Sequence, residues 1–479
     1  MRLTTIIETL FRRFLPSPFS IALLLTAMTF VLALIFTEPQ TTDPYWLSLL
    51  GYWEQGIWQK DLLVFAYQMM LILVLGHMLV LSPVMNRFIL AMTSGIKGTT
   101  HAVVLVSVLT MLVSFFNWGL GLIFGALMAR KVGEAAQLQG RKINYPLVGA
   151  AAYVGMMIWH GGISGSAPAK VGESGHLRGL VGDEMGAFLP DYIAYTDTVF
   201  SPENIVIFII LLIGTPLLLI WIGGPGKDAI PELGVSYDKN RQGNDPSEIS
   251  NIKESQKLDR DKKNSPLSFR SWINISWDES KLLAYGFGIA IILAFVYNYG
   301  ATLAGGIVTP NMLNFFMLGL IFLLHGSISS ILRAVDEAIS GASGILIQFP
   351  LYFGIMGVMQ NSGLVVAIAD YFVALSSPQT LPLLTFFSAA IVNVFIPSGG
   401  GQWAIQGPVI LEAAIALKVP VEKVIMALAY GDQLTNMLQP FWALPLLGIT
   451  KLKASELLPY TLWVMLLGIL VFVIGLILW

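Results

Sequence analysis

The chain has 479 residues, of which 55% are hydrophobic and only 12% are charged, whereas about a quarter of the residues in an average soluble domain carry charge. The net charge of −2 and the sequence pI of about 6.2 exclude the broad basic surface that nucleic-acid binding requires. Because the chain has no cysteine, disulfides, thiolate-bound zinc and thiol catalysis are excluded as well.

The first apolar run, residues 19–36, follows Arg2, Arg12 and Arg13. It is long for a signal peptide and lacks a small-residue cleavage site, so we predict that it is the first membrane span. The mean hydropathy of +0.73 reflects many further apolar runs long enough to cross a bilayer. Since Lys and Arg accumulate in cytoplasmic loops, the amino terminus is predicted to be cytoplasmic.

The apolar segment 101–128 is predicted to be a re-entrant hairpin. The cations before it, Arg87 and Lys97, and those in the loop 130–142 all belong on the cytoplasmic face by the positive-inside rule. The segment must therefore enter and leave the membrane on the same side. Its middle, residues 117–121, contains an asparagine and two glycines, which a continuous apolar helix would not need.

A polar segment, residues 226–280, separates two apolar halves of the chain. Its mixed-charge run at 253–263 favours a solvated tether over a binding motif. We therefore predict a first transmembrane repeat at 1–225, a cytoplasmic linker at 226–280 and a second repeat at 281–479.

The second half contains a matching hairpin, predicted at 380–412, which the positive-inside rule places on the opposite side of the membrane. Asn117 and Asn393 are 276 residues apart, and Ala152-Tyr153 recurs 277 residues later as Ala429-Tyr430. Such offsets are typical of inverted-repeat transporters. The predicted fold is an all-α polytopic membrane protein with about 11 transmembrane helices and two re-entrant hairpins in an inverted repeat, its carboxyl terminus outside.

Both hairpins are interrupted by glycines, and a half-helix that begins after such a break directs unpaired N–H groups and a positive dipole end at an anion. The alternative is that the glycines form a turn or a close-packing patch. The predicted carboxylate-binding residues are Asn117, Trp118, Gly119, Asn393, Ser398, Gly399, Gly400 and Gly401. A short acyl tail could lie against an apolar wall of four tryptophans, for which the alternative is an interfacial or packing role. These are Trp118, Trp159, Trp403 and Trp442.

Irregular segments at 159–168 and 430–440 each follow a hairpin and contain the candidates for ion coupling, His160, Asp432 and Asn436. An acid within a membrane span is costly, so Asp432 is predicted to bind a co-transported H⁺ or Na⁺. The alternatives are a structural carboxylate for Asp432 and a packed neutral imidazole for His160. No cofactor, metal site or catalytic residue is expected.

Nearly the whole chain resembles the short-chain fatty acid transporter family, the AtoE type, among the ion-transporter-like carriers. The resemblance lies in the segments 117–121, 348–350, 396–403, 405–408 and 439–445. It implies uptake of butyrate- or acetoacetate-type monocarboxylates across a bacterial inner membrane. His160 stands where the family has glycine, and Asp432 stands where it has glutamate.

We therefore predict a secondary active transporter that moves a small carboxylate anion together with protons or sodium. The oligomeric state that we consider for it is a homodimer. A sodium/proton antiporter or another small-anion carrier is the alternative of related architecture. A passive channel is less favoured, because inverted repeats with paired hairpins are typical of alternating access. A membrane-embedded enzyme is less favoured, because the sequence has no His-Glu-x-x-His motif and no paired intramembrane aspartates.

Overall fold

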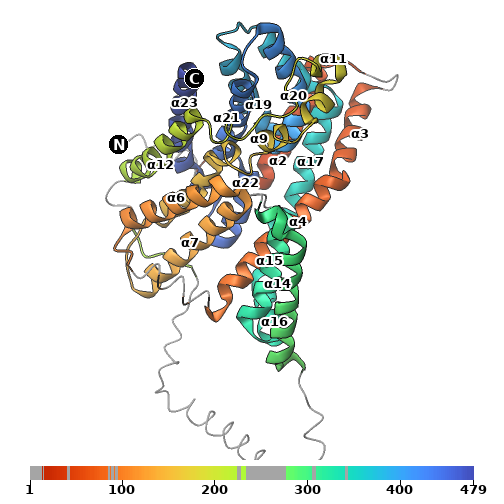
Figure 1. Ribbon diagram of the computed structural model, residues 1–479. Coiled ribbons are helices and arrows are strands. Elements are labelled where there is room, and N and C mark those ends of the chain that lie inside the picture. The colour runs from red at the N-terminus through yellow and green to blue at the C-terminus, as the bar shows by residue number, and fades with distance from the viewer. Residues whose placement is uncertain are drawn as a thin grey trace, which may run out of the picture.

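The computed structural model describes residue 13, residues 16–39 and 44–84, residues 87 and 91, and residues 95–223, 228–233, 277–304, 309–339 and 343–479. Within these ranges the chain forms helices and connecting turns but no strand (Figure 1). The nearest approach to a sheet is one isolated antiparallel bridge between Ile143 and Ala229. The prediction of an all-α protein is confirmed.

The helices of the first half are α2 (Pro18–Phe36), α3 (Tyr45–Ile57), α4 (Lys60–Leu81), α6 (Thr99–Phe116), α7 (Trp118–Leu138), α8 (Tyr145–Tyr153), η1 (Val154–Met157), η2 (Trp159–Gly161), α9 (Ser166–Val171), α10 (His176–Val181), α11 (Asp183–Gly186) and α12 (Pro202–Gly223). Those of the second half are η5 (Trp277–Glu279), α14 (Lys281–Ala304), α15 (Pro310–His325), α16 (Ile328–Ala338), α17 (Ser343–Asn361), α18 (Leu364–Ala374), α19 (Leu381–Phe395), α20 (Gly399–Leu417), α21 (Val421–Thr435), η7 (Asn436–Leu438), α22 (Pro440–Thr450) and α23 (Ala454–Leu478).

Seven helices in the described ranges are long and apolar enough to cross a membrane, or up to eight if the bent pair 346–361 and 364–374 forms one span. The predicted number of 11 is not confirmed, because several apolar segments form shorter helices, such as α15, α19 and α22. Large apolar side chains cover the outside of α14, where Leu282 and Tyr297 are 87% and 90% exposed. Such a surface suits lipid, and the protein is a multi-pass membrane protein.

The first hairpin consists of α6 and α7, which lie side by side (Figure 1). Asn117 separates them in an extended conformation, with φ −150° and ψ 122°. Its Oδ1 accepts a hydrogen bond from the backbone N–H of Leu120 at 2.9 Å, which is the bond of a helix N-cap. The interruption predicted at 117–121 is therefore a helix start, and the re-entry into the membrane stays a prediction.

Helix α7 continues to Leu138, beyond the expected end of the hairpin at 128. The sequence predicts a loop for the cations of 130–142. In the structure, Glu134 instead pairs with Arg130 and Lys131 inside the helix. The distances are 2.7 Å to Arg130 Nε and 2.6 Å to Lys131 Nζ. Because these pairs compensate the charges on one helix face, the helix does not need to end before them.

The second hairpin consists of α19 and α20, and it begins its second leg in the same way. Ser398, with φ −151° and ψ 99°, caps α20 by accepting a hydrogen bond from the N–H of Gly401 at 3.2 Å. The structural counterpart of Asn117 is thus Ser398. Matching Asn117 with Asn393 is wrong in position, because Asn393 lies within α19.

The two halves pack reciprocally. Helix α17 of the second half packs against α2 and α3 of the first, while α4 of the first half packs against α15 and α16 of the second. Near the hairpins, α22 contacts α7 and α9 contacts α20. This exchange of partners is consistent with an internal repeat. The predicted linker lies outside the described residues except for 228–233 and 277–280, so its role stays a prediction.

Candidate functional site

The second halves of both hairpins begin beside one side chain, Trp159, in the irregular segment after α8. Its ring centroid lies 5.9 Å from that of Trp118, at the start of α7. At the start of α20, a Cβ placed on Gly399 would come within 2.9 Å of Cη2 of Trp159. Trp159 is 2% exposed, so it fills the space between the two hairpin tips.

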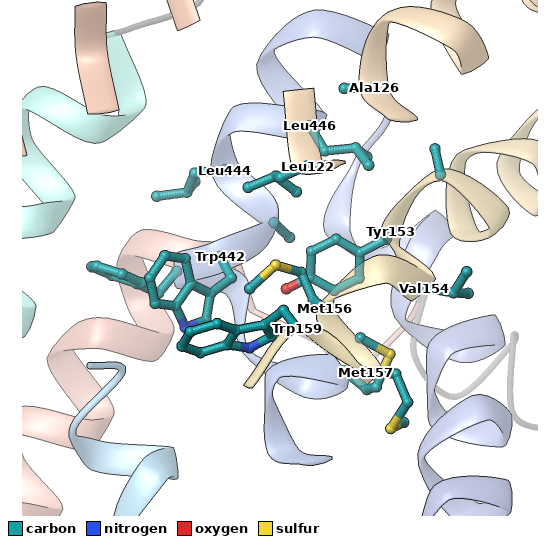
Figure 2. Close-up of a cluster of buried hydrophobic side chains, with 14 of the residues drawn as sticks. Leu122, Ala126, Tyr153, Val154, Met156, Met157, Trp159, Trp442, Leu444 and Leu446 are labelled. Atoms are coloured by element: carbon teal, nitrogen blue, oxygen red, sulfur yellow. The ribbon is translucent and has the colours of Figure 1, made fainter. Parts of the chain in front are cut away.

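An aromatic cluster extends from this point. Trp118, Trp159 and Trp442 have ring centroids 5.1 to 6.4 Å apart, and Figure 2 shows Trp159 and Trp442 next to each other among aliphatic side chains. Phe65 continues the cluster 6.2 Å from Trp442. Three of the four tryptophans that were considered for an apolar wall are therefore together. Trp403 is in a separate apolar cluster.

His160 and Asp432 form a buried pair. Nδ1 of His160 lies 2.7 Å from Oδ1 of Asp432, and the two side chains are 0% and 1% exposed. The N–H of Ala167 donates to Nε2 of His160 at 3.1 Å. Nε2 therefore carries no proton, so the neutral imidazole has its proton on Nδ1 and donates it to Asp432. The structure brings together two predicted ion-coupling residues 272 positions apart in sequence.

Asn393 joins the second hairpin to the break after α21. Its amide Nδ2 donates to the carbonyl of Asp432 at 2.6 Å, to Oγ1 of Thr435 at 2.9 Å and to Oδ1 of Asn436 at 2.8 Å. Since these bonds occupy the amide donors, Asn393 holds the hairpin against the broken helix. Of its two side-chain polar atoms, Oδ1 is the one without a partner among the residues that the structure describes.

Several buried polar atoms around the tips have no hydrogen-bond partner within the described part of the chain. Such atoms are rare in native proteins, and each costs about 1–3 kcal/mol, so a cluster of them indicates a place where a ligand, ion or water binds. The atoms are Trp159 Nε1, Trp442 Nε1, Asn436 Nδ2, Asp432 Oδ2, Asn393 Oδ1, Gln402 Oε1, Gln439 Oε1 and Tyr352 Oη.

The two hairpin tips differ in how many backbone N–H groups are available to bind an anion. At the start of α7, the N–H of Trp118 donates to Oγ of Ser164 at 3.0 Å, and the cap by Asn117 occupies a second donor. At the start of α20, Gly399 and Gly400 are the first two residues, whose N–H groups have no acceptor within the helix. Gly400 is also exposed. An anion is therefore better accommodated at α20 than at Gly119 of α7.

Gln433, the residue after Asp432, also contributes to the candidate site. Its Oε1 accepts hydrogen bonds from the backbone N–H groups of His160 at 2.9 Å and Gly161 at 3.2 Å. Gln433 thus fixes the irregular segment that presents His160. Its position next to an intramembrane acid was the only sequence signal for this role.

Two tyrosines, which the sequence identified only as a repeated dipeptide, connect the halves. Tyr153 donates to the carbonyl of Asn436 at 2.8 Å. Tyr430 donates to Oδ1 of Asn204 at 2.8 Å, and Asn204 Nδ2 donates to the carbonyl of Gly161 at 2.8 Å. Each tyrosine therefore supports the irregular segment of the other half, directly or through Asn204.

A cavity of about 770 Å³ lies elsewhere, lined by residues 143–146, 229, 231–233, 451–453, 456 and 460. None of the unpartnered atoms near the tips belongs to its lining. We base the candidate site on those atoms, because unsatisfied buried donors and acceptors indicate binding more directly than volume does.

The separate environment of Trp403 leads to a prediction about pH. Trp403 Nε1 donates to Nε2 of His176 in α10 at 3.0 Å, which requires that Nε2 has no proton. Burial, with a smaller contribution from Lys170, lowers the pKa of His176 below its ordinary value of 6.5. The loop that contains His176 therefore binds fewer protons when it is packed on Trp403 than when it is detached. The contact contributes its full stability above about pH 6.5, and this contribution decreases as the pH falls below that value.

We expect faster hydrogen exchange in residues 172–186 at pH 5 than at pH 7.5, after correction for intrinsic exchange rates. In the variant His176→Gln, whose amide oxygen can accept the same hydrogen bond without titrating, this difference should disappear. Equal protection of the wild-type segment at both pH values would contradict the prediction.

Apolar helices with lipid-suited surfaces define a multi-pass membrane protein, and the candidate site is the buried polar centre between its two capped hairpin tips. The chain matches the family described as "Short chain fatty acid transporter" over residues 1–479, and it belongs to that family of transporters.

Two relatives carry the name "Putative short-chain fatty acid transporter". The one from Escherichia coli (strain K12) is 36% identical over 471 residues, 97% of this chain and 96% of the relative. The one from Haemophilus influenzae is 34% identical over 488 residues, 99% of each chain. Among solved structures, the Alcanivorax borkumensis YdaH transporter is 18% identical with a TM-score of 0.39, covering 96% of this chain and 98% of that one. Neisseria gonorrhoeae MtrF is 14% identical with a TM-score of 0.34, covering 99% and 97%.

Proposed function

We propose that the protein is a secondary active transporter that takes up short-chain monocarboxylates, of the butyrate or acetoacetate type, together with a cation. The observation that carries the proposal is the group of unpartnered buried donors beside an aromatic cluster at the start of α20. A short-chain fatty acid has the same two parts, a carboxylate and a small apolar tail. The names of the two relatives agree with this substrate class.

In this proposal the carboxylate binds at the start of α20. The N–H groups of Gly399 and Gly400 and the positive end of the helix dipole face it, and a hydrogen bond to a charged group contributes about 1.5–3 kcal/mol. The indole N–H groups of Trp159 and Trp442 are further donors within the cluster, since both are buried and have no acceptor in the described ranges. The tail then lies against the rings of Trp118 and its neighbours, where burying each CH₂ contributes about 0.8 kcal/mol.

We place the protein in the bacterial cytoplasmic membrane, with its amino terminus in the cytoplasm and its carboxyl terminus outside. The reciprocal packing of the two halves suits alternating access, in which the part that contains the hairpins moves relative to α17, α2 and α3. A homodimer stays a prediction. A sodium/proton antiporter or a carrier of another small anion is the alternative.

The test is the initial rate of labelled butyrate uptake into proteoliposomes, measured over a range of butyrate concentrations. Ser398→Ala removes the cap of α20, which costs about 0.5–2 kcal/mol, so the apparent substrate affinity should fall roughly twofold to thirtyfold. The matched control is Ser17→Ala, because Ser17 caps α2 through the same kind of bond, from Ser20 N to its Oγ at 3.2 Å, away from the site. Unchanged affinity in both Ser398→Ala and Asn393→Ala would contradict the proposed site.

A further inference from the structure

This inference rests on the proposed function and concerns the ion that moves with the substrate. We propose that this ion is a proton, and that it binds to Oδ2 of Asp432 in the buried His160–Asp432 pair. Oδ1 of the same carboxylate accepts the hydrogen bond from His160, whereas Oδ2 is buried and has no partner in the described part of the chain. The free oxygen is therefore the available place for an added proton.

The charge of the pair supports this assignment. Because Nε2 of His160 accepts the N–H of Ala167, the imidazole is neutral and the carboxylate is negative before the proton binds. A buried carboxylate that lacks a cationic partner is strongly disfavoured. Formation of one O–H bond at Oδ2 changes the net charge of the pair from −1 to 0 and removes that cost.

No nearby cation offers the same compensation among the described residues. On the helices that pack against the pair, the basic side chains are His101, Lys170 and Lys423. His101 is exposed, Lys170 pairs with Glu173 at 2.9 Å on the surface, and Lys423 donates to the carbonyl of Trp479 at 2.9 Å.

The remaining titratable groups on those helices are exposed, partly exposed or hydrogen-bonded to other residues. Glu412 is exposed, and Glu456 accepts the N–H of Lys453 at 2.9 Å. Tyr430 donates to Asn204, and Tyr460 accepts from Asn144 at 3.1 Å. Glu422, the last of these groups, lies at the start of α21 and is partly exposed.

Geometry connects the pair to the substrate site. A Cβ on Gly399 would lie 2.8 Å from Cε1 and 3.2 Å from Nδ1 of His160, so the start of α20 packs directly on the imidazole. A carboxylate bound at that helix end would be repelled by a negative Asp432, because buried surroundings screen charge less than water does. Protonation removes the repulsion. The anion therefore binds after the proton, and the two cross together as one H⁺ and one monocarboxylate, without net charge.

The experiment uses the full chain in proteoliposomes. Undissociated butyric acid also crosses lipid without a carrier. At equilibrium this leak distributes butyrate across the membrane as a one-to-one proton symporter would. We therefore measure initial rates and subtract the rate in protein-free vesicles. Uptake is compared under an inward pH gradient, an inward Na⁺ gradient and no gradient. A second assay follows counterflow of labelled against unlabelled butyrate at equal pH on both sides.

For the wild type we expect the pH gradient, and not the Na⁺ gradient, to stimulate uptake. Asp432→Asn, in which the neutral amide replaces the protonated acid, should lose this stimulation, with a ratio of rates near 1, while counterflow continues. Asp370→Asn is the matched control, because Asp370 is an exposed acid on α18, and it should behave as the wild type. His160→Gln, as a second variant in case Asp432→Asn does not fold, should likewise weaken stimulation more than counterflow.

Stimulation by Na⁺ alone, or stimulation by the pH gradient that persists in Asp432→Asn, would overturn the proton assignment while leaving the carboxylate carrier intact. Absence of both uptake and counterflow in the wild type would instead overturn the proposed function, and this inference with it.

Discussion

Gly399→Ala is expected to lower the initial rate of substrate uptake by roughly fivefold to 150-fold, because overpacking of a buried site costs about 1–3 kcal/mol. The added Cβ would lie 2.8 Å from Cε1 of His160 and 2.9 Å from Cη2 of Trp159. Both rings are almost fully buried, so neither can move aside. The start of α20 must shift instead, and the donors that we assign to the carboxylate shift with it.

The control for this prediction is Gly286→Ala on α14. A Cβ at Gly286 meets no atom within 4 Å, so helix propensity changes but packing does not. Uptake should be measured at equal amounts of reconstituted protein. At Gly400 the nearest atom to an added Cβ is Ser166 Oγ at 3.9 Å, so the steric loss there should be smaller than at Gly399. Wild-type rates in Gly399→Ala would show that the tip is not tightly packed on the irregular segment.

Asn393→Asp is expected to destabilise the protein severely and to abolish transport. The amide donates to three acceptors within 2.9 Å, on Asp432, Thr435 and Asn436. A carboxylate at this position has no proton to donate and would face those acceptors in a buried site. An uncompensated buried charge costs about 3–5 kcal/mol, which is a large part of the stability of most domains.

Gln139→Glu is the matched amide-to-acid control, because Gln139 is exposed at the end of α7 and lies outside the candidate membrane spans. Thermal unfolding in detergent and elution on gel filtration would be recorded for both variants. We expect a clearly lower midpoint or loss of monodisperse protein for Asn393→Asp only. Equal midpoints for the two variants would mean that the network around Asn393 does not hold the hairpin in place.

Composition alone was sufficient to predict the class of protein. A chain with 12% charged residues and a mean hydropathy of +0.73 cannot form a soluble domain of ordinary surface, and the helices with lipid-suited faces agree. The break at 117–121 was also predictable, since a polar residue followed by glycine interrupts an apolar run. The number of spans was not, because length and hydropathy do not distinguish a continuous span from the short helices α15, α19 and α22.

The sequence predicted individual residues of the candidate site better than it predicted how they are arranged in space. Asp432 and His160 were selected individually, because a titratable side chain in an apolar run is costly. Their pairing depends on the irregular segment after α8 and the last turns of α21, which are 272 positions apart in sequence and meet only in the folded chain. The assignment of Asn393 as a substrate ligand illustrates the same limit, since its amide donors are directed into the protein.

The sequence by itself determined that this protein is a helical membrane protein, that two apolar hairpins are interrupted, and that few polar residues lie within its apolar segments. These properties follow from local composition and from residues that interrupt a helix. Only the tertiary structure decided that Ser398 is the counterpart of Asn117, that Trp159 lies between the tips while Trp403 packs elsewhere, and that Oδ2 of Asp432 has no partner among the described residues. Hydrogen-bond partners and close packing depend on contacts between distant segments, which spacing along the chain does not specify.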